Sequence, residues 1–135
     1  MLKFFFGPHS CALASHIALE ESGLDYQATR LDLAAGDQRK PEYLKINPKA
    51  RVPALVTDRG VLTENPAILA YIAQTATKVK LAPLDDPYAF GKIQAFNAYL
   101  CAPVHVAHAH GRRGYRWADE QSSFDDMKRK VPETM

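Results

Sequence analysis

Long hydrophobic runs are absent from this sequence. No stretch approaches the roughly 20 apolar residues that a membrane-spanning helix needs. The apolar opening, Leu2 to Phe6, stops at Gly7-Pro8, whereas a secretory signal needs a longer apolar stretch followed by a small-residue cleavage site. We therefore predict a cytoplasmic protein with no membrane partner.

Cysteine and net charge are also scarce. The two cysteines, Cys11 and Cys101, lie far apart and do not suggest a disulfide framework. The 17 basic and 15 acidic residues leave a formal net charge of +2, too little to indicate a nucleic-acid partner. What is present is a globular composition, 47% hydrophobic and 24% charged over 135 residues. This length suits one ordinary domain, or a small domain plus part of another.

The chain begins with a strand–helix–strand pattern. The apolar run at 2–6 predicts a buried strand, the helical spacing over 11–22 predicts a helix that Gly23 ends, and the alternation over 26–33 predicts a second strand. Three elements in so few residues indicate a βαβ unit with two parallel strands.

Two more strands and a helix follow. Residues 52–56 and 61–62 predict strands joined by a short turn, hence an antiparallel hairpin. Residues 64–76 predict a helix with Pro66 in its first turn. The periodicity over 88–110 then predicts one long helix bent at Pro103.

A last helix is predicted near the end of the chain. Ser122 or Ser123 is expected to cap it, because a hydroxyl at this position accepts a hydrogen bond from a backbone amide of the first turn.

The first chemical motif is Ser10-Cys11, where the first strand meets the first helix. Unpaired amides at a helix N-terminus carry partial positive charge, which stabilises a thiolate there or the sulfur of a bound thiol. The alternative is that Cys11 is a small packing residue and Ser10 a simple helix cap.

The second motif is the segment 47–53. A proline that opens a strand often follows a cis peptide bond, and a cis bond before Pro53 would turn the Val52 backbone outward to pair with an extended peptide. An ordinary trans proline at a strand edge is the alternative.

The third motif is the segment 63–68, where a strand runs directly into a helix. Its amides would hold a carboxylate and Glu64 an ammonium, which together suit the head of an α-amino acid. A capped helix without a ligand is the alternative.

These three motifs, in this order, resemble the N-terminal domain of cytosolic glutathione transferases, most closely the bacterial beta class. The residues that carry the resemblance are Gly7-Pro8-His9-Ser10-Cys11, Asn47-Pro48-Lys49-Ala50-Arg51-Val52-Pro53-Ala54-Leu55 and Leu62-Thr63-Glu64-Asn65-Pro66-Ala67-Ile68. The resemblance implies an α/β thioredoxin-like domain with a cis proline over residues 1–77, a linker over 78–87 and an incomplete all-α domain over 88–135.

The resemblance also implies roles for the residues of the first two motifs. Cys11, with Ser10 beside it, is expected to be catalytic and to face the sulfur of glutathione. Val52, before Pro53, is expected to pair through its backbone with the cysteinyl unit, while Arg51 reaches the glycyl carboxylate.

The γ-glutamyl end would then be held by Glu64 and Asn65. In the beta class, residues at positions like Asn97, Cys101 and His105 face the glutathione site from the first long helix. Cys101 and His105 are also one helical turn apart, a spacing that a metal could share, but a fourth ligand is not apparent and no metal site is predicted. The alternative is that these three residues form a solvent-exposed polar helix face with no ligand.

Some features depart from the family. The run Phe4-Phe5-Phe6 lacks the tyrosine with which other classes activate glutathione, and most of the helical domain is missing. A helical piece this small needs a partner for its apolar side chains. We therefore expect a homodimer, or else a fragment of a longer chain.

Three functions remain open. The first is a transferase that conjugates glutathione, its co-substrate, to small hydrophobic electrophiles in detoxification, with no cofactor. The second is a glutathione-dependent thiol-disulfide reductase, limited to a monothiol route because Ala14 stands where a Cys-x-x-Cys pair would have its second cysteine. The third is a non-catalytic glutathione-binding protein.

Overall fold

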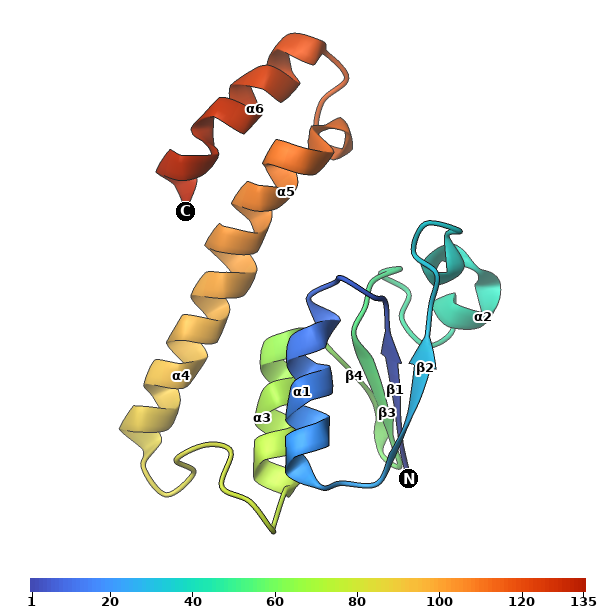
Figure 1. The fold of residues 1–135 in the computed structure, drawn as a ribbon, viewed down its shortest axis with the longest axis vertical. Coiled ribbons are helices and arrows are strands. Elements are labelled where there is room, and N and C mark those ends of the chain that lie inside the picture. Colours follow the sequence, from blue (N-terminus) through green and yellow to red (C-terminus); the bar gives the residue numbers. More distant parts are fainter. The chain divides into compact units, whose positions relative to one another are not determined.

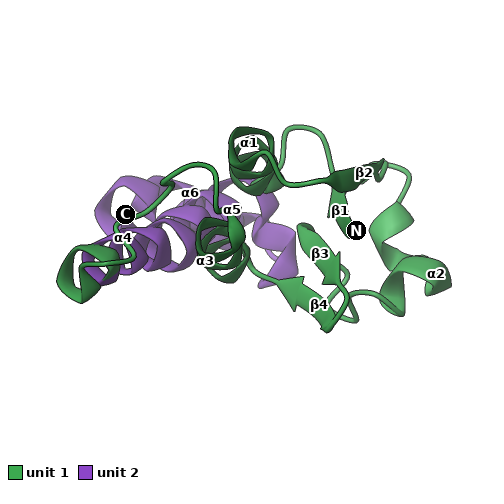
Figure 2. Cartoon of the chain, turned by 90° about the horizontal axis from the view of Figure 1, so that it is seen from below, with its two compact units in different colours: residues 1–90 green, residues 91–135 purple.

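The computed structural model describes residues 1–135. The chain forms two compact units, Met1–Phe90 and Gly91–Met135 (Figure 2). The division lies inside a helix, and residues 76–86 before that helix contain no helix or strand. The domain limits expected from the sequence, at residues 77 and 88, stay a prediction.

The first unit is built on a four-stranded mixed sheet. Its strands are β1 (Leu2–Phe6), β2 (Tyr26–Arg30), β3 (Ala54–Thr57) and β4 (Gly60–Thr63), in the order β2-β1-β3-β4. β1 runs parallel to β2 and antiparallel to β3, and β3 and β4 form an antiparallel hairpin. The predicted βαβ unit and hairpin are both confirmed.

Two helices cover one face of this sheet. Figure 1 shows α1 (Ala12–Ser22) and α3 (Asn65–Thr75) beside each other on that face, with the short α2 (Pro41–Leu44) on the other side. Gly23, with φ 65°, ends α1 in the left-handed conformation that glycine adopts without strain. A 3₁₀ turn, η1 (Asp37–Arg39), precedes α2.

The core follows from this layering. Six fully buried side chains fill the space between the sheet and the two helices: Phe4, Ala12, Leu19, Leu55, Ile68 and Ile72. A smaller cluster of Leu31, Tyr43 and Ala54 lies on the opposite face. Apolar burial of this kind stabilises a fold by about 25 cal/mol per Å² removed from water. Because side chains are buried on both faces, the sheet is a stable support for the loops at the ends of its strands.

The second unit is helical. Helix α4 (Pro87–Tyr99), whose first turn belongs to the first unit, continues through a π-helical segment, η2 (Leu100–Val104), into α5 (His105–Arg113). The long helix is therefore present, but Pro103 is accommodated by π-helical widening, and Figure 1 shows α4 and α5 following nearly one line. Proline has no backbone N–H, so Pro103 cannot make the usual helical hydrogen bond, and this missing bond causes the irregularity.

The chain then turns back. A 3₁₀ turn, η3 (Gly114–Arg116), leads to α6 (Gln121–Thr134), which packs along α5 (Figure 1). The predicted cap is wrong: Glu120 is the N-cap residue, and its carbonyl accepts the amides of Ser123 and Phe124. Because the helix begins earlier than the serines suggest, both hydroxyls lie inside its first turn.

The second unit buries little. Only Ala107 and Gly114 are buried in it, while Phe96 is 61% exposed. None of the chain's helices has the length and hydropathy to cross a lipid bilayer.

Candidate functional site

The turn between β1 and α1 is held by Ser10. Its hydroxyl donates to the Gly7 carbonyl over 2.6 Å and accepts the Ala12 amide at 3.3 Å, while the Leu13 amide donates to the Ser10 carbonyl. The expectation that the first helical amides are unpaired is therefore wrong for Ala12 and Leu13, because the Ser10 side chain and carbonyl reach them first. Ser10 shapes the turn that presents Cys11.

Cys11 lies at the N-cap position of α1 and is exposed. Its Sγ lies 3.7 Å from the Val52 carbonyl oxygen. The fold thus brings together the first and second motifs, which are 41 residues apart in the sequence.

The peptide bond between Val52 and Pro53 is cis, as predicted. Val52 is half-buried, and its N–H donates no hydrogen bond within the chain. The sheet does not use it either, since β3 begins at Ala54. Val52 therefore offers an unused main-chain N–H, while its carbonyl lies next to the Cys11 thiol.

The loop before Val52 is fixed from the other face of the sheet. The Arg51 carbonyl accepts the Tyr43 hydroxyl at 2.6 Å and the Asn47 side-chain amide at 2.7 Å. Burial raises the pKa of Tyr43 to about 12, although the Asn47 side chain acts in the opposite direction. This hydroxyl therefore stays a donor near neutral pH. The Arg51 side chain is exposed.

Glu64 occupies a strained backbone conformation at the start of α3. Its φ is 72°, a left-handed value that a non-glycine residue rarely adopts and that is concentrated at functional sites. Its carboxylate pairs with the Lys49 ammonium, which also donates to the Thr63 hydroxyl at 2.9 Å. Sequence reasoning missed Lys49, although it lies within the second motif.

Asn65 takes a role that the sequence did not predict. It is buried, its Nδ2 donates to the Cys11 carbonyl at 2.7 Å, and its Oδ1 accepts the Ser15 hydroxyl at 2.6 Å. The side chain therefore ties α3 to α1, and both of its polar atoms are hydrogen-bonded within the chain. What remains for a ligand at this helix start are the backbone amides of Asn65 and Ala67, which have no partner within the chain.

Asn97 and His105 lie in the second unit, on α4 and α5. Their expected approach to the site stays a prediction. No group of three or more side chains that could bind a metal is gathered in the structure.

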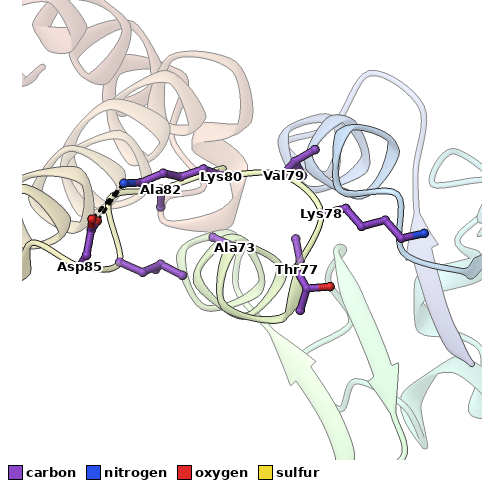
Figure 3. A pocket seen from close by; sticks show the side chains of 9 residues that line it. Ala73, Thr77, Lys78, Val79, Lys80, Ala82 and Asp85 are labelled. Atoms are coloured by element: carbon purple, nitrogen blue, oxygen red, sulfur yellow. Dashed lines mark hydrogen bonds and ion pairs between the residues drawn. The ribbon is translucent and has the colours of Figure 1, made fainter.

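A surface hollow of about 440 Å³ lies elsewhere in the first unit. It is lined by the end of α3 and the segment after it, where Lys80 forms an ion pair with Asp85 at 3.0 Å (Figure 3). The hydrogen bond from Lys80 is the main cause that lowers the pKa of Asp85. None of the predicted site residues lines this hollow.

A four-stranded mixed sheet with a cis peptide bond at Val52-Pro53, next to a cysteine at a helix start, defines the class of thioredoxin-like domains. Residues 1–74 match the family model described as glutathione S-transferase, N-terminal domain. The chain belongs to the glutathione S-transferase family, as the sequence motifs predicted.

Individual relatives agree with this assignment. Glutathione S-transferase GST-4.5 from Xanthomonas campestris pv. campestris is 34% identical over 134 residues, which cover 96% of this chain and 65% of that protein. A glutathione transferase homologue from Sulfitobacter, solved with bound glutathione, is 49% identical with a TM-score of 0.89 and covers 100% of this chain and 65% of its own.

Beta-class enzymes are among the structural neighbours. The beta-class glutathione S-transferase of Sphingomonas chungbukensis is 33% identical with a TM-score of 0.75, over 95% of this chain and 65% of its own. The chain thus spans about two-thirds of the length of the three proteins compared.

Proposed function

We propose that this chain binds glutathione and conjugates its thiol to small electrophiles. The observation that carries the proposal is the main chain of Val52, whose carbonyl lies beside the exposed Cys11 thiol and whose N–H is unused within the chain. An extended peptide would add to Val52 as an extra strand, with main-chain hydrogen bonds supplying affinity. The Sulfitobacter homologue, which was solved with glutathione, supports this reading.

The charged groups of the rest of the tripeptide would be bound by residues from the same loops. The exposed Arg51 guanidinium suits the glycyl carboxylate, and the free amides of Asn65 and Ala67 at the start of α3 suit the γ-glutamyl carboxylate. Glu64 supplies the anion for the γ-glutamyl ammonium. Asn65 thus contributes its backbone, while its side chain supports Cys11.

The chemical step requires a thiolate aimed at an electrophile. Cys11, placed by the Ser10 turn, would lie next to the glutathione sulfur and orient it. Holding the thiolate at a fixed position converts an encounter in solution into a reaction between neighbours, which lowers the barrier. Asn97 and His105 are proposed to complete the site from the helical unit.

Calorimetric titration with glutathione, followed by conjugation of a chromogenic electrophile, tests the proposal. We expect binding and activity in the unchanged chain, and a loss of activity with retained binding in Cys11→Ala. Glu21→Ala, on an exposed position of the same helix, is the control and should leave both unchanged. Absence of glutathione binding in the unchanged chain would contradict the proposal.

The exposed Cys11 thiol also favours a second function, thiol-disulfide exchange. The Cys11 thiolate would attack a mixed disulfide of glutathione, forming a Cys11–glutathione disulfide and releasing the substrate thiol. A second glutathione thiolate would then attack, restoring Cys11 and leaving oxidised glutathione. Reduction of a mixed-disulfide substrate that Cys11→Ser abolishes would support this route; glutathione binding without either activity would support a non-catalytic role.

We also propose a cytoplasmic homodimer. Several large apolar side chains of the helical unit are exposed, namely Ile93, Phe96, Tyr99 and Leu100. Surfaces of this kind commonly mark protein interfaces. Light scattering across a range of concentrations tests the proposal, and a monomer at every concentration would contradict it.

A further inference from the structure

Lys49 occupies the place at which the proposed function needs a ligand ammonium. Its Nζ pairs with the Glu64 carboxylate and donates to the Thr63 hydroxyl at 2.9 Å. A carboxylate and a hydroxyl around one ammonium are the partners that the amino group of a γ-glutamyl unit would seek. The chain thus fills its own ammonium site with its own cation.

The backbone of Lys49 is held in place, whereas its side chain is exposed to solvent. The Lys49 amide donates to the Oδ1 of Asn47, which is 1% exposed, so the backbone at this point is fixed. The Lys49 and Glu64 side chains are 50% and 63% exposed. Ion pairs exposed to this degree are weak and exchange readily, so a ligand can displace Lys49 at a modest cost.

Resting on the proposed function, we propose that Lys49 is a specificity-determining residue: an internal competitor for the ligand's ammonium. Ligands that carry the ammonium must displace Lys49 from Glu64 before they gain that contact. Ligands without the ammonium leave the pair intact. Lys49 therefore lowers the preference of the site for glutathione over analogues that lack the amino group.

The test compares two ligands in one calorimetric series. One is glutathione and the other is its des-amino analogue, in which a glutaryl group replaces the γ-glutamyl group. The measured quantity is the ratio of the two Kd values, des-amino over amino. Any general attraction between Lys49 and the carboxylates common to both ligands cancels in this ratio, so the ratio isolates the ammonium contact.

We expect Lys49→Met and Lys49→Gln to raise this ratio about two- to fivefold, in keeping with the small strength of exposed ion pairs. Lys49→Arg should keep the ratio near that of the unchanged chain, because the cation remains. The matched control is Lys40→Met, which removes an exposed lysine paired with Asp37 and should not change the ratio.

The outcomes separate this inference from the proposed function. If the unchanged chain binds neither ligand, the proposed function fails and the inference falls with it. If glutathione binds but Lys49→Met and Lys49→Gln leave the ratio unchanged or lower it, only the role of Lys49 is overturned. Circular dichroism of each variant confirms that the fold is retained.

Discussion

The side-chain amide of Asn65 donates a hydrogen bond to the backbone carbonyl of Cys11 over 2.7 Å. This contact joins the first turn of α3 to the N-cap residue of α1. Since Cys11 also lies against Val52, the position of its thiol depends on α3 as well as on its own turn.

Replacing Asn65 with alanine should destabilise the chain by about 1–3 kcal/mol. The substitution leaves the buried Ser15 hydroxyl without its acceptor and removes one donor from the Cys11 carbonyl, and an unsatisfied buried polar group costs about this much. Urea denaturation measures the change. Gln74→Ala, at an exposed position of the same helix, should have little effect. Equal stability losses in the two variants would contradict the linking role of Asn65.

Replacing Gly7 with alanine should also destabilise the chain, by about 1–3 kcal/mol. A Cβ at this position would lie 2.5 Å from Leu33 Cδ1 and 2.6 Å from Cγ, so Leu33 or the backbone must move. Gly91→Ala is the opposite case, because nothing lies within 4 Å and the residue is inside α4. It should be neutral or stabilise by up to about 1 kcal/mol. Thermal unfolding of the two variants checks the contrast.

Incubation with oxidised glutathione should add one glutathionyl group at Cys11. The Cys11 thiolate attacks one sulfur of the disulfide, and the other glutathione leaves as a thiol. Intact mass spectrometry detects the adduct, and peptide mapping distinguishes Cys11 from the other exposed cysteine, Cys101. An adduct found mainly at Cys101, or one that survives in Cys11→Ser, would show that the proposed site does not direct the reaction.

Stability should fall as the pH rises from about 10 towards 12. Burial raises the pKa of Tyr43 in the folded state to about 12, above its ordinary value of 10.0, so the fold favours the protonated hydroxyl. The contribution is therefore complete below pH 10 and lost as the pH passes through the folded pKa.

Tyr43→Phe should reduce this pH dependence, while denaturation at neutral pH reports the loss of the hydrogen bond to Arg51. The pKa of Tyr26 is also raised to about 12, mainly by burial and then by Glu20, so part of the dependence should remain. A Tyr43→Phe curve that matches the unchanged chain from pH 10 to 12 would contradict the assignment.

Much of the fold was predictable from local pattern. The apolar run of β1, the glycine after α1 and the short turn between β3 and β4 are signals carried by neighbouring residues. Propensity and periodicity act over a few residues, so they can be read along the chain. The local pattern was misleading at the N-cap of α6. The two serines are typical capping residues, but the helix starts earlier, where the Glu120 carbonyl accepts the first hydrogen bonds.

The site was predictable in part. The cis bond before Pro53 and the proximity of Cys11 to Val52 follow from motifs that the chain carries in order. The role of the Asn65 side chain in linking α3 to α1 was not predictable. Its partner Ser15 lies 50 residues away, and the two side chains meet only because α1 packs on α3.

By itself, then, the sequence determined the order of strands and helices, the family and the three motifs of the site, because these depend on residues close together along the chain. Tertiary structure alone decided which side chains within those motifs are engaged. It placed Lys49 on Glu64 and turned the Asn65 side chain inward to Cys11 and Ser15. Hydrogen bonds and ion pairs between distant segments form only when packing brings their atoms within about 3 Å.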